Sequence, residues 1–380
     1  MQYRVLAQRV LIGATFAIIT SAVLSQRASR AQDEALLGLP ITMSPDARPP
    51  TAAQVELGRK LFMDRRLSPN NTMSCAMCHV PEQGFAANEL ATAVGINGRS
   101  VKRNAPTVLN VAFNQALFWD GRETSLENQV WQPILNPNEM GNASVRAVLD
   151  KINRLADYAG AFEQAYDGAR PTSENVARAV AAYERSLIAG NSRFDRWFYG
   201  KDKQALTDLE QQGFAAFNRF GCAQCHSYGE QSALFTDQRY HNTGIGWAAV
   251  RKDKTYIVPL APGVNIEVKE SELASVSEEI PGDQGRFEAT RKESERYQYR
   301  TPSLRNVALT APYMHDGSLA TLEDVIEFYA KGGIDNPGRD ALLRRLEMTV
   351  QDKRALAGFL RTLASEEHRR LVQKARGQNK

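Results

Sequence analysis

The chain has no cysteine outside two five-residue motifs, C-A-M-C-H at Cys75–His79 and C-A-Q-C-H at Cys222–His226. Two disulfides would use all the cysteines, but they would not explain the histidine that follows each pair. A zinc site could combine two C-x-x-C pairs, yet it does not need a histidine directly after both. A covalent c-type haem uses every one of these residues, because two thioethers hold the porphyrin edge and the adjacent imidazole ligates the iron. The motifs therefore predict two covalently bound haems, attached through Cys75, Cys78, His79, Cys222, Cys225 and His226.

Histidine is scarce as well: the chain has 5, and none lies between Val80 and Gly221. An iron with one protein ligand keeps an open face that can bind a small oxidant, whereas a second strong ligand usually makes the haem an electron carrier. After the first motif Met140 is the main thioether candidate, and a methionine in that setting more often packs in a core. We therefore expect the first haem to be open on one side.

The second half offers more candidates for a sixth iron ligand, and the residues alone do not choose among them. These candidates are Met314, His315, Tyr329 and Met348. We expect His241, within R-Y-H-N-T-G, to organise a loop rather than to bind iron. The basic tail from His368 to Lys380 is expected to be a frayed and solvated end.

The N-terminus lacks any charged residue over the apolar run Val10–Leu24. This run is short for a membrane span, and the small residues Ser29 and Ala31 form an acceptable cleavage pattern. We predict a secretory signal peptide over residues 1–31 and a periplasmic mature protein without integral membrane association; an uncleaved anchor is the alternative. Loss of the signal removes arginines and no acid, which leaves a formal charge near zero and gives no reason to expect nucleic acid as a partner.

The chain also contains an internal repeat. An amphipathic segment precedes each motif, at Ala52–Leu67 and Ala205–Phe220, and both segments carry Gly-x-x-x-Phe. Each unit closes with a similar stretch, A-V-A-A-Y-E-R-S-L at Ala179–Leu187 and A-L-A-G-F-L-R-T-L at Ala355–Leu363. A helix before the haem motif and an aromatic-bearing helix that crosses it form the minimal plan of a c-type cytochrome.

This repeat predicts an all-α fold of two cytochrome c-like domains, residues 32–192 and residues 193–380, each with one covalent haem. The two domains would join around Gly190–Asp195. Long connections such as Asp237–Arg300 are polar with scattered glycine and proline, so we expect loops there.

Four further motifs occur in a defined order along the chain: R-N-A-P-T-V-L-N at Arg103–Asn110, F-W-D-G-R at Phe118–Arg122, N-P-N-E-M at Asn136–Met140, and T-P-S-L-R-N-V-A-L-T-A-P-Y-M-H-D-G-S at Thr301–Ser318. With the haem motifs they span nearly the whole mature chain. In these motifs the sequence resembles the bacterial di-haem cytochrome c peroxidase superfamily and, within it, the MauG-type enzymes. The resemblance implies a two-domain, mostly helical fold.

The resemblance also implies roles for single residues. His79 would ligate the peroxide-reacting haem and His226 the second haem. Trp119 matches an aromatic residue between the haems, where an indole can be oxidised transiently and divide one long electron step into two; interdomain packing is the alternative role. Gln129 and Glu139 match a polar pair over the open haem face, an amide to orient peroxide and a carboxylate to move its proton.

The resemblance implies one bound calcium ion between the haems. Its ligands would be Asn104 and the backbone carbonyls of Thr310 and Pro312, because calcium prefers hard oxygen donors.

Two positions depart from the plain peroxidase pattern. Many di-haem peroxidases carry a displaceable histidine ligand where this chain has Ile96, and isoleucine cannot bind iron, so the first haem should be open without reductive activation. Fourteen residues beyond His315, where those peroxidases place a methionine ligand, this chain has Tyr329. MauG-type proteins use a tyrosine there, and Met314 is the alternative ligand. A phenolate is hard and anionic and stabilises highly oxidised iron, whereas a thioether favours ferrous iron.

These features predict a periplasmic di-haem enzyme that uses hydrogen peroxide to oxidise side chains, typically tryptophan, of a partner protein through a high-valent two-haem state. The partner could be the precursor of a quinone cofactor or a copper-binding protein. One alternative is a peroxidase that reduces peroxide with electrons from a small cytochrome or copper protein, and another is an electron-transfer cytochrome without catalysis. Trp131, Trp197 and Trp247 are candidate exit points for electrons, and the sequence assigns no route among them.

Overall fold

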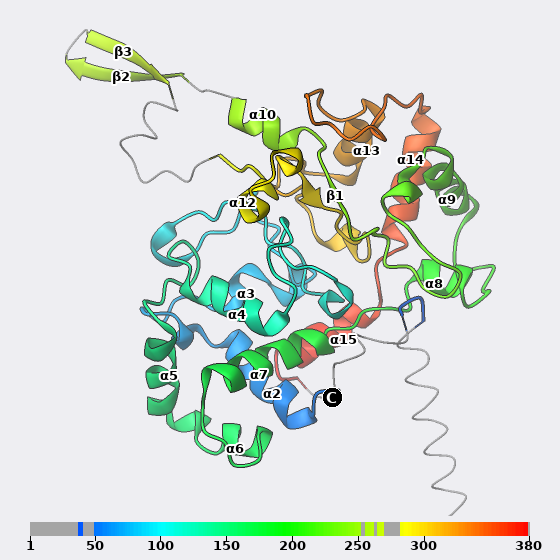
Figure 1. Cartoon of the computed structure of the whole chain (residues 1–380). Coiled ribbons are helices and arrows are strands. Elements are labelled where there is room, and N and C mark those ends of the chain that lie inside the picture. The colour runs from blue at the N-terminus through cyan, green and yellow to red at the C-terminus, as the bar shows by residue number, and fades with distance from the viewer. Residues whose placement is uncertain (1–36, 41–48, 252–254, 262–263, 270–281, 379–380) are drawn as a thin grey trace, which may run out of the picture.

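The computed structural model describes residues 37–40, 49–251, 255–261, 264–269 and 282–378 (Figure 1). The signal peptide predicted over residues 1–31 lies outside these ranges. Within them, no helix is both long and apolar enough to cross a membrane.

The first half is a group of helices around the first haem motif. Its helices are α2 (Ala52–Met63), α3 (Cys75–Cys78), α4 (Leu126–Leu135), α5 (Val145–Arg154), α6 (Ala161–Ala165) and α7 (Ser173–Ser186). Thr51 begins α2 with a capping box: its hydroxyl accepts from the backbone N–H of Gln54, and the Gln54 amide oxygen accepts from the backbone N–H of Thr51. The long helix α7 packs along α2 and also against α4, and α2 in turn contacts α3, the helical turn of the haem motif.

The second half repeats this arrangement around the second haem motif. Its helices include α8 (Arg193–Phe198), α9 (Asp208–Arg219), α13 (Leu322–Ala330) and α14 (Val350–Arg361). Helix α9 packs along α14, as α2 packs along α7. The predicted helical architecture is therefore confirmed in both halves.

The glycine of each Gly-x-x-x-Phe lies at the crossing point of its helix pair. A Cβ atom on Gly58 would lie 1.8 Å from the backbone oxygen of Ala179, and a Cβ on Gly213 would lie 2.0 Å from the backbone oxygen of Ala355. No larger residue fits at these separations, so glycine is what lets the paired helices approach each other. The sequence repeat thus encodes a repeated close helix crossing.

Two hydrophobic cores accompany the two halves. The first contains residues of α2, α4, α5 and α7, with Phe62 and Phe162 fully buried. The second is built largely of buried phenylalanine side chains, among them Phe194, Phe217, Phe235 and Phe359. Edge-to-face and tilted contacts connect these rings, with centroids 5.2–6.2 Å apart.

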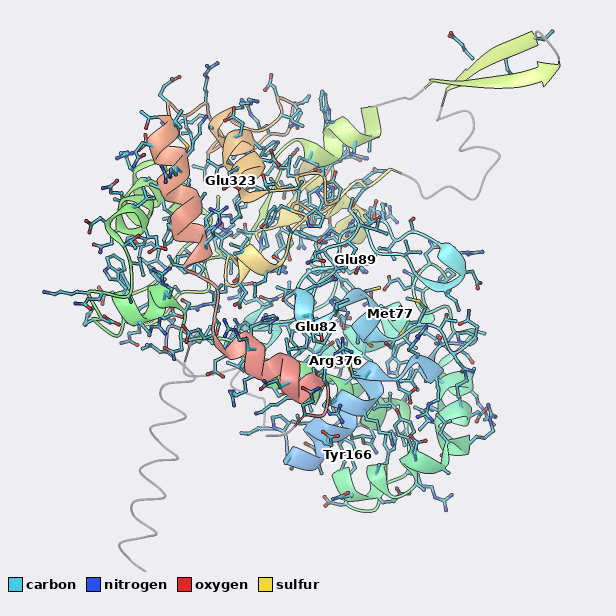
Figure 2. All side chains as sticks on the ribbon, turned by 180° about the vertical axis from the view of Figure 1, so that it is seen from behind. Met77, Glu82, Glu89, Tyr166, Glu323 and Arg376 are labelled. Carbon is cyan, nitrogen blue, oxygen red and sulfur yellow. The ribbon has the colours of Figure 1, made fainter. Side chains whose placement is uncertain are left out.

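The prediction of a frayed basic tail is wrong. Residues Glu367–Ala375 form helix α15, which lies beside α7 and α2 of the first half (Figure 1). Leu371 and Ala375, one helical turn apart, belong to the first core, and Arg376 pairs with Glu82 at 2.7 Å (Figure 2). The amphipathic spacing of these apolar residues outweighs the basic composition, and the C-terminus of the chain is anchored on its first half.

The expectation of loops throughout Asp237–Arg300 is also wrong in part. Strands β2 (Thr255–Ala261) and β3 (Val264–Lys269) pair as an antiparallel hairpin, which extends away from the helical body beyond α10 (Ile245–Arg251) (Figure 1). The apolar and β-branched stretch T-Y-I-V-P-L-A and the alternating V-N-I-E-V-K are strand patterns that the polar composition of the whole segment obscured. Two further short strands, β1 (Tyr240–His241) and β4 (Tyr299–Arg300), and the helix α12 (Phe287–Thr290) lie against the body.

Candidate haem sites and the interface between them

The first haem motif forms the single helical turn α3, and its cysteine thiols are not joined in a disulfide. The Nδ1 atom of His79 lies 3.3 Å from the backbone oxygen of Phe85, so Nδ1–H donates to that carbonyl and Nε2 is the nitrogen left for a metal. Phe85 is fully buried and adopts a left-handed backbone conformation with φ 54°, which directs its carbonyl at the imidazole. Burial lowers the pKa of His79 and favours the neutral ring that ligates iron.

The second haem motif uses the same device. His226 Nδ1 lies 3.0 Å from the backbone oxygen of Phe235, a buried residue with φ 53°. Burial lowers the pKa of His226 as well. Both motif histidines are therefore oriented by a phenylalanine carbonyl, and both offer Nε2 to a metal.

A cavity of about 280 Å³ lies against the second motif. Its lining includes His226, both cysteines of that motif, and Tyr329 from α13. Burial raises the pKa of Tyr329, and among the described residues nothing hydrogen-bonds its hydroxyl. Met314 and Met348 line the same cavity, so the structure brings the tyrosine and both methionine candidates together at the second haem site.

Two of the three remaining histidines, His241 and His368, hydrogen-bond to other groups of the protein. His241 lies between two carboxylates, with Nδ1 2.5 Å from Asp340 and Nε2 2.9 Å from Asp237, which fits the expectation that it organises a loop. His241, Asp237 and Cys225 also lie within 4.8 Å of one another, but a thioether at Cys225 would remove the thiolate that a metal site there would need. His368 on α15 lies 2.7 Å from the backbone oxygen of Pro81, close to the first haem motif.

The predicted peroxide-handling residues follow the first motif on α4 and the loop after it. Gln129 lies half-buried on α4, and Glu139 accepts a hydrogen bond from Asn136 Nδ2 at 2.7 Å. Burial raises the pKa of Glu139. Burial, followed by the Glu139 charge, raises the pKa of Cys78 to about 11, which indicates that this carboxylate lies near the first haem motif.

Ile96 and Met140 lie next to Glu139, and the side chains of both are buried in the first core. The backbone N–H of Ile96 donates to the backbone oxygen of Glu139 at 2.7 Å, and its side chain is buried in the first core. Met140 is buried in the same core, as the sequence suggested for a methionine in that setting.

The two halves meet through a pair of matching turns. The turn that holds Trp119 is closed by a bridge between Leu117 and Glu123, and the turn that holds His315 is closed by the equivalent bridge between Tyr313 and Leu319. The D-G that follows both Trp119 and His315 is the sequence signal for this equivalence.

Each of the two matching turns accepts a backbone hydrogen bond from a residue of the other half. The N–H of Arg300 donates to the Trp119 carbonyl and the N–H of Asn104 donates to the His315 carbonyl, both at 2.7 Å. The Trp119 indole N–H donates to the Asn104 carbonyl at 2.8 Å. The His315 ring stacks on the Tyr299 ring, with centroids 3.6 Å apart. An oxidisable indole is thus held firmly at the interface of the two halves.

The residues predicted to bind calcium line the same cavity as Trp119. Asn104, Thr310 and Pro312 all line the cavity of the second haem site. Asn104 Nδ2 donates to the backbone oxygen of Ala91 at 2.9 Å, which leaves the side-chain oxygen as the atom available to a cation.

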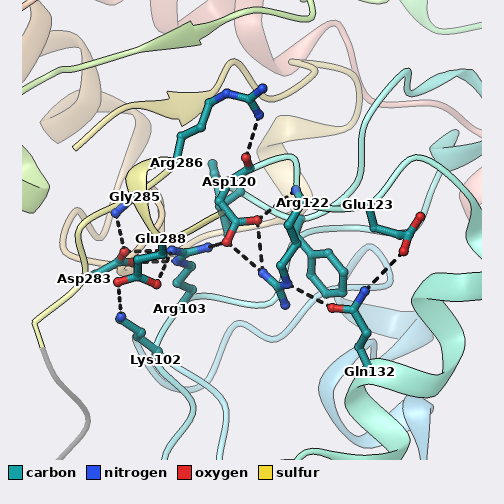
Figure 3. Close-up of polar contacts among 12 residues, drawn as sticks. Lys102, Arg103, Asp120, Arg122, Glu123, Gln132, Asp283, Gly285, Arg286 and Glu288 are labelled. Atoms are coloured by element: carbon teal, nitrogen blue, oxygen red, sulfur yellow. Dashed lines mark hydrogen bonds and ion pairs between the residues drawn. The ribbon is translucent and has the colours of Figure 1, made fainter. Parts of the chain in front are cut away.

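A network of ion pairs fixes the Trp119 turn to the second half (Figure 3). Arg103 pairs with Asp120, the neighbour of Trp119, at 2.6 Å and with Asp283 at 2.6 Å. Arg122 adds a second ion pair to Asp120 at 2.9 Å. The sequence did not reveal the link to the second half, because Arg103 and Asp283 lie 180 residues apart in the chain.

The three candidate exit tryptophans lie apart on different elements. The Trp131 indole on α4 donates to the backbone oxygen of Ser173 at 3.3 Å, and Trp197 on α8 packs against Phe194 and Phe214. Trp247 lies on α10, next to the hairpin. Nothing in these contacts selects one of them as an electron exit.

Haem fits the residues present in both halves. Each half supplies two unpaired cysteines and an oriented, neutral histidine, and the second adds a cavity with a potential oxygen ligand. Two similar helical units that meet at an indole, each with its own C-x-x-C-H motif, define the class of di-haem c-type proteins.

Comparison with known proteins identifies the family. The family model described as di-haem cytochrome c peroxidase matches residues 52–203. The methylamine utilization protein MauG of Methylorubrum extorquens is 36% identical over 324 residues, which cover 85% of this chain and 81% of that protein. Cytochrome c551 peroxidase of Pseudomonas aeruginosa is 33% identical over 324 residues, covering 85% and 82%. A crystal structure of a MauG-like protein associated with microbial copper homeostasis is 29% identical, with a TM-score of 0.71 over 87% of this chain and 95% of that one.

The chain belongs to the di-haem cytochrome c peroxidase family and is a haem-dependent oxidoreductase. The family implies two c-type haems, which agrees with the two motifs and with the oriented histidines. It does not by itself distinguish a MauG-type enzyme from a plain peroxidase, because both kinds of relative are similarly close.

Proposed function

We propose that this chain is a periplasmic enzyme that uses hydrogen peroxide to oxidise tryptophan side chains of a partner protein. Tyr329 is the observation that carries the proposal. It lines one cavity with His226, Cys222 and Cys225, so it would be available as the sixth ligand to the second iron. The haems, when bound, accept the oxidising equivalents of peroxide and hold them until a donor supplies electrons.

The chemistry of Tyr329 suits storage of oxidising power. A phenolate is a hard, anionic ligand, which favours ferric and more oxidised iron. A buried phenol does not ionise readily by itself, and burial raises the pKa of Tyr329. A bound cation is what would stabilise its phenolate in this cavity, so the surroundings of Tyr329 fit a metal ligand.

At the first haem site, Glu139 and Gln129 would handle peroxide. Heterolysis of peroxide needs a proton taken from one oxygen and delivered to the other, and a carboxylate whose pKa is raised by burial is better suited to hold that proton than an exposed one. Asn136 Nδ2 holds the Glu139 carboxylate in place at 2.7 Å. Gln129 would orient the peroxide, and Ile96, which has no donor atom, would leave the iron accessible.

Trp119 would carry electrons between the two sites. Its indole donates to the Asn104 carbonyl at 2.8 Å, and its own carbonyl accepts from Arg300. Asn104, with Thr310 and Pro312, would hold one calcium ion in the same cavity. The cation would then stiffen the segment that supports the indole.

The relatives are consistent with a protein substrate. MauG of Methylorubrum extorquens supports a partner in methylamine utilization, and the copper-associated MauG-like structure supports a copper protein. A peroxidase fed by a small cytochrome is the second candidate, favoured by the similarity to cytochrome c551 peroxidase and by Met314 and Met348 in the cavity.

Steady-state assays with a reduced small cytochrome separate the two functions. We expect slow peroxide turnover by the fully ferric protein and peroxide-dependent oxidation of a tryptophan in a periplasmic partner, detected by mass spectrometry of candidate proteins. Tyr329→Met is the matched variant, and we expect it to gain cytochrome turnover and to lose partner oxidation. Rapid cytochrome turnover by the unmodified ferric protein would contradict the proposal, and an unchanged haem spectrum on peroxide addition would indicate a non-catalytic cytochrome.

A further inference from the structure

Arg300 is a buried cation without an anion beside it. The residue is 6% exposed, and among the described residues no carboxylate pairs with it. In the part of the chain that the structure describes, its guanidinium reaches only backbone oxygens, with Nε 3.3 Å from Phe118 O and Nη1 3.5 Å from Thr301 O. These are long contacts for a charged donor. Burial is the main influence on its pKa, which it lowers.

Other buried arginines of this chain are paired. Arg305 holds Asp195 with both nitrogens at 2.9 Å, and those side chains are 2% and 0% exposed. Arg103 lies between Asp120 and Asp283. A buried charge needs a partner, because an unpaired ion loses its hydration without gaining a compensating interaction. The missing partner of Arg300 is therefore expected to be an anion that is not part of the described chain.

The place of Arg300 indicates the source of that anion. Arg300 lines the same cavity as His226, Cys222 and Cys225, where the second haem would be attached. Haem carries two carboxylate side chains, and the planar guanidinium matches a carboxylate with two parallel hydrogen bonds. His315 lines the cavity too; it is 4% exposed, and its nearest acid, Asp283, is 4.0 Å from Nε2, beyond hydrogen-bond reach. Among the described residues, neither of these two buried basic side chains has a carboxylate within hydrogen-bond reach, and both line the same cavity.

We propose that Arg300 binds a carboxylate of the second haem. The same residue donates its backbone N–H to the Trp119 carbonyl and its Nε to the Phe118 carbonyl. Arg300 would therefore join the edge of the second haem to the turn that holds Trp119. This role concerns the haem and not the oxidised substrate, so it stands unchanged if the enzyme proves to be a plain peroxidase.

Resonance Raman spectroscopy of the haem-loaded protein tests the contact directly. In Arg300→Met we expect the propionate bending band of the low-spin second haem to shift, because its carboxylate loses the guanidinium. We expect the midpoint potential of that haem to fall, because removal of a nearby positive charge favours the ferric state. The bands and the potential of the first haem should not change.

Two further variants make the test specific. Arg300→Lys keeps the charge but loses the planar fork, so the band should still shift while the potential stays closer to that of the unmodified protein. Arg286→Met is the control, because Arg286 stacks over Tyr240 at 3.8 Å and pairs with Glu295 in the same neighbourhood without lining the cavity. It should leave the band in place.

Four results would overturn the proposal. One is a propionate band that is unchanged in both Arg300 variants, or in Arg300→Lys if Arg300→Met does not fold. Another is an equal shift in Arg286→Met, which would indicate a general field and not a contact. The third is a band shift confined to the first haem, which would place the contact at the other site. A shift in the unmodified protein when phosphate replaces chloride in the buffer would likewise assign the anion beside Arg300 to the solvent.

Discussion

Leu371 on α15 tests whether the C-terminal helix is part of the first core. Its side chain is 4% exposed within that core, and His368 of the same helix contacts the Pro81 carbonyl. Truncation of a buried leucine to alanine loses its transfer free energy and leaves a cavity, which together cost about 2–5 kcal/mol. We expect Leu371→Ala to lower the free energy of unfolding of the first half by about 3 kcal/mol.

Guanidinium titration of the haem-loaded protein measures this change. The absorbance of the first haem should report unfolding at a lower denaturant concentration in Leu371→Ala, while the second haem should respond less. Val350→Ala is the control, because Val350 is 85% exposed on α14 and its truncation should change stability by less than about 0.5 kcal/mol. If the two variants unfold alike, α15 does not pack on the first half and the reasoning fails.

Three more predictions concern the helix crossing, the peroxide site and a buried ion pair. Gly213→Ala should push α9 away from Ala355 and reduce haem incorporation in the second half, measured by the pyridine haemochrome content of purified protein; full incorporation would contradict the crossing. Glu139→Gln should slow the stopped-flow reaction with peroxide by about 10²–10⁴-fold. In the unmodified protein that rate should fall as the pH drops through the raised pKa of Glu139, because the ionised base is lost, and a flat profile would exclude it. Asp195→Asn should cost about 3–5 kcal/mol in thermal or chemical unfolding, because it leaves Arg305 buried without its partner, and a stable variant would refute that cost.

The local features of this chain could be predicted from its sequence. The two C-x-x-C-H motifs indicated haem, and the internal repeat indicated a helix before each motif and a second helix crossing it. The structure adds the reason for the repeated glycines, which lie where the paired helices approach each other most closely. These signals are short and carry their own geometry. Ile96 and Tyr329 bear on the predicted iron ligation because of their side chains. Isoleucine has no atom that can bind iron, and tyrosine offers a hard oxygen ligand.

Long-range features could not be predicted. The docking of α15 depends on Leu371 joining a core whose other residues lie far away in the chain, and composition alone made the segment look solvated. Arg300 is part of no acidic or basic pattern, and its significance appears only when burial and the cavity are known. The same holds for the network of Arg103, whose partner Asp283 is 180 residues away.

The visible and near-infrared spectrum of the fully ferric protein tests the central claim, ligation of the second iron by Tyr329, most directly. We predict a low-spin haem spectrum without sulfur-to-iron charge transfer, altered in Tyr329→Phe, together with an unchanged high-spin first haem. A sulfur-to-iron charge-transfer band in the unmodified protein, retained in Tyr329→Phe, would place Met314 or Met348 on the iron. That result would contradict the account.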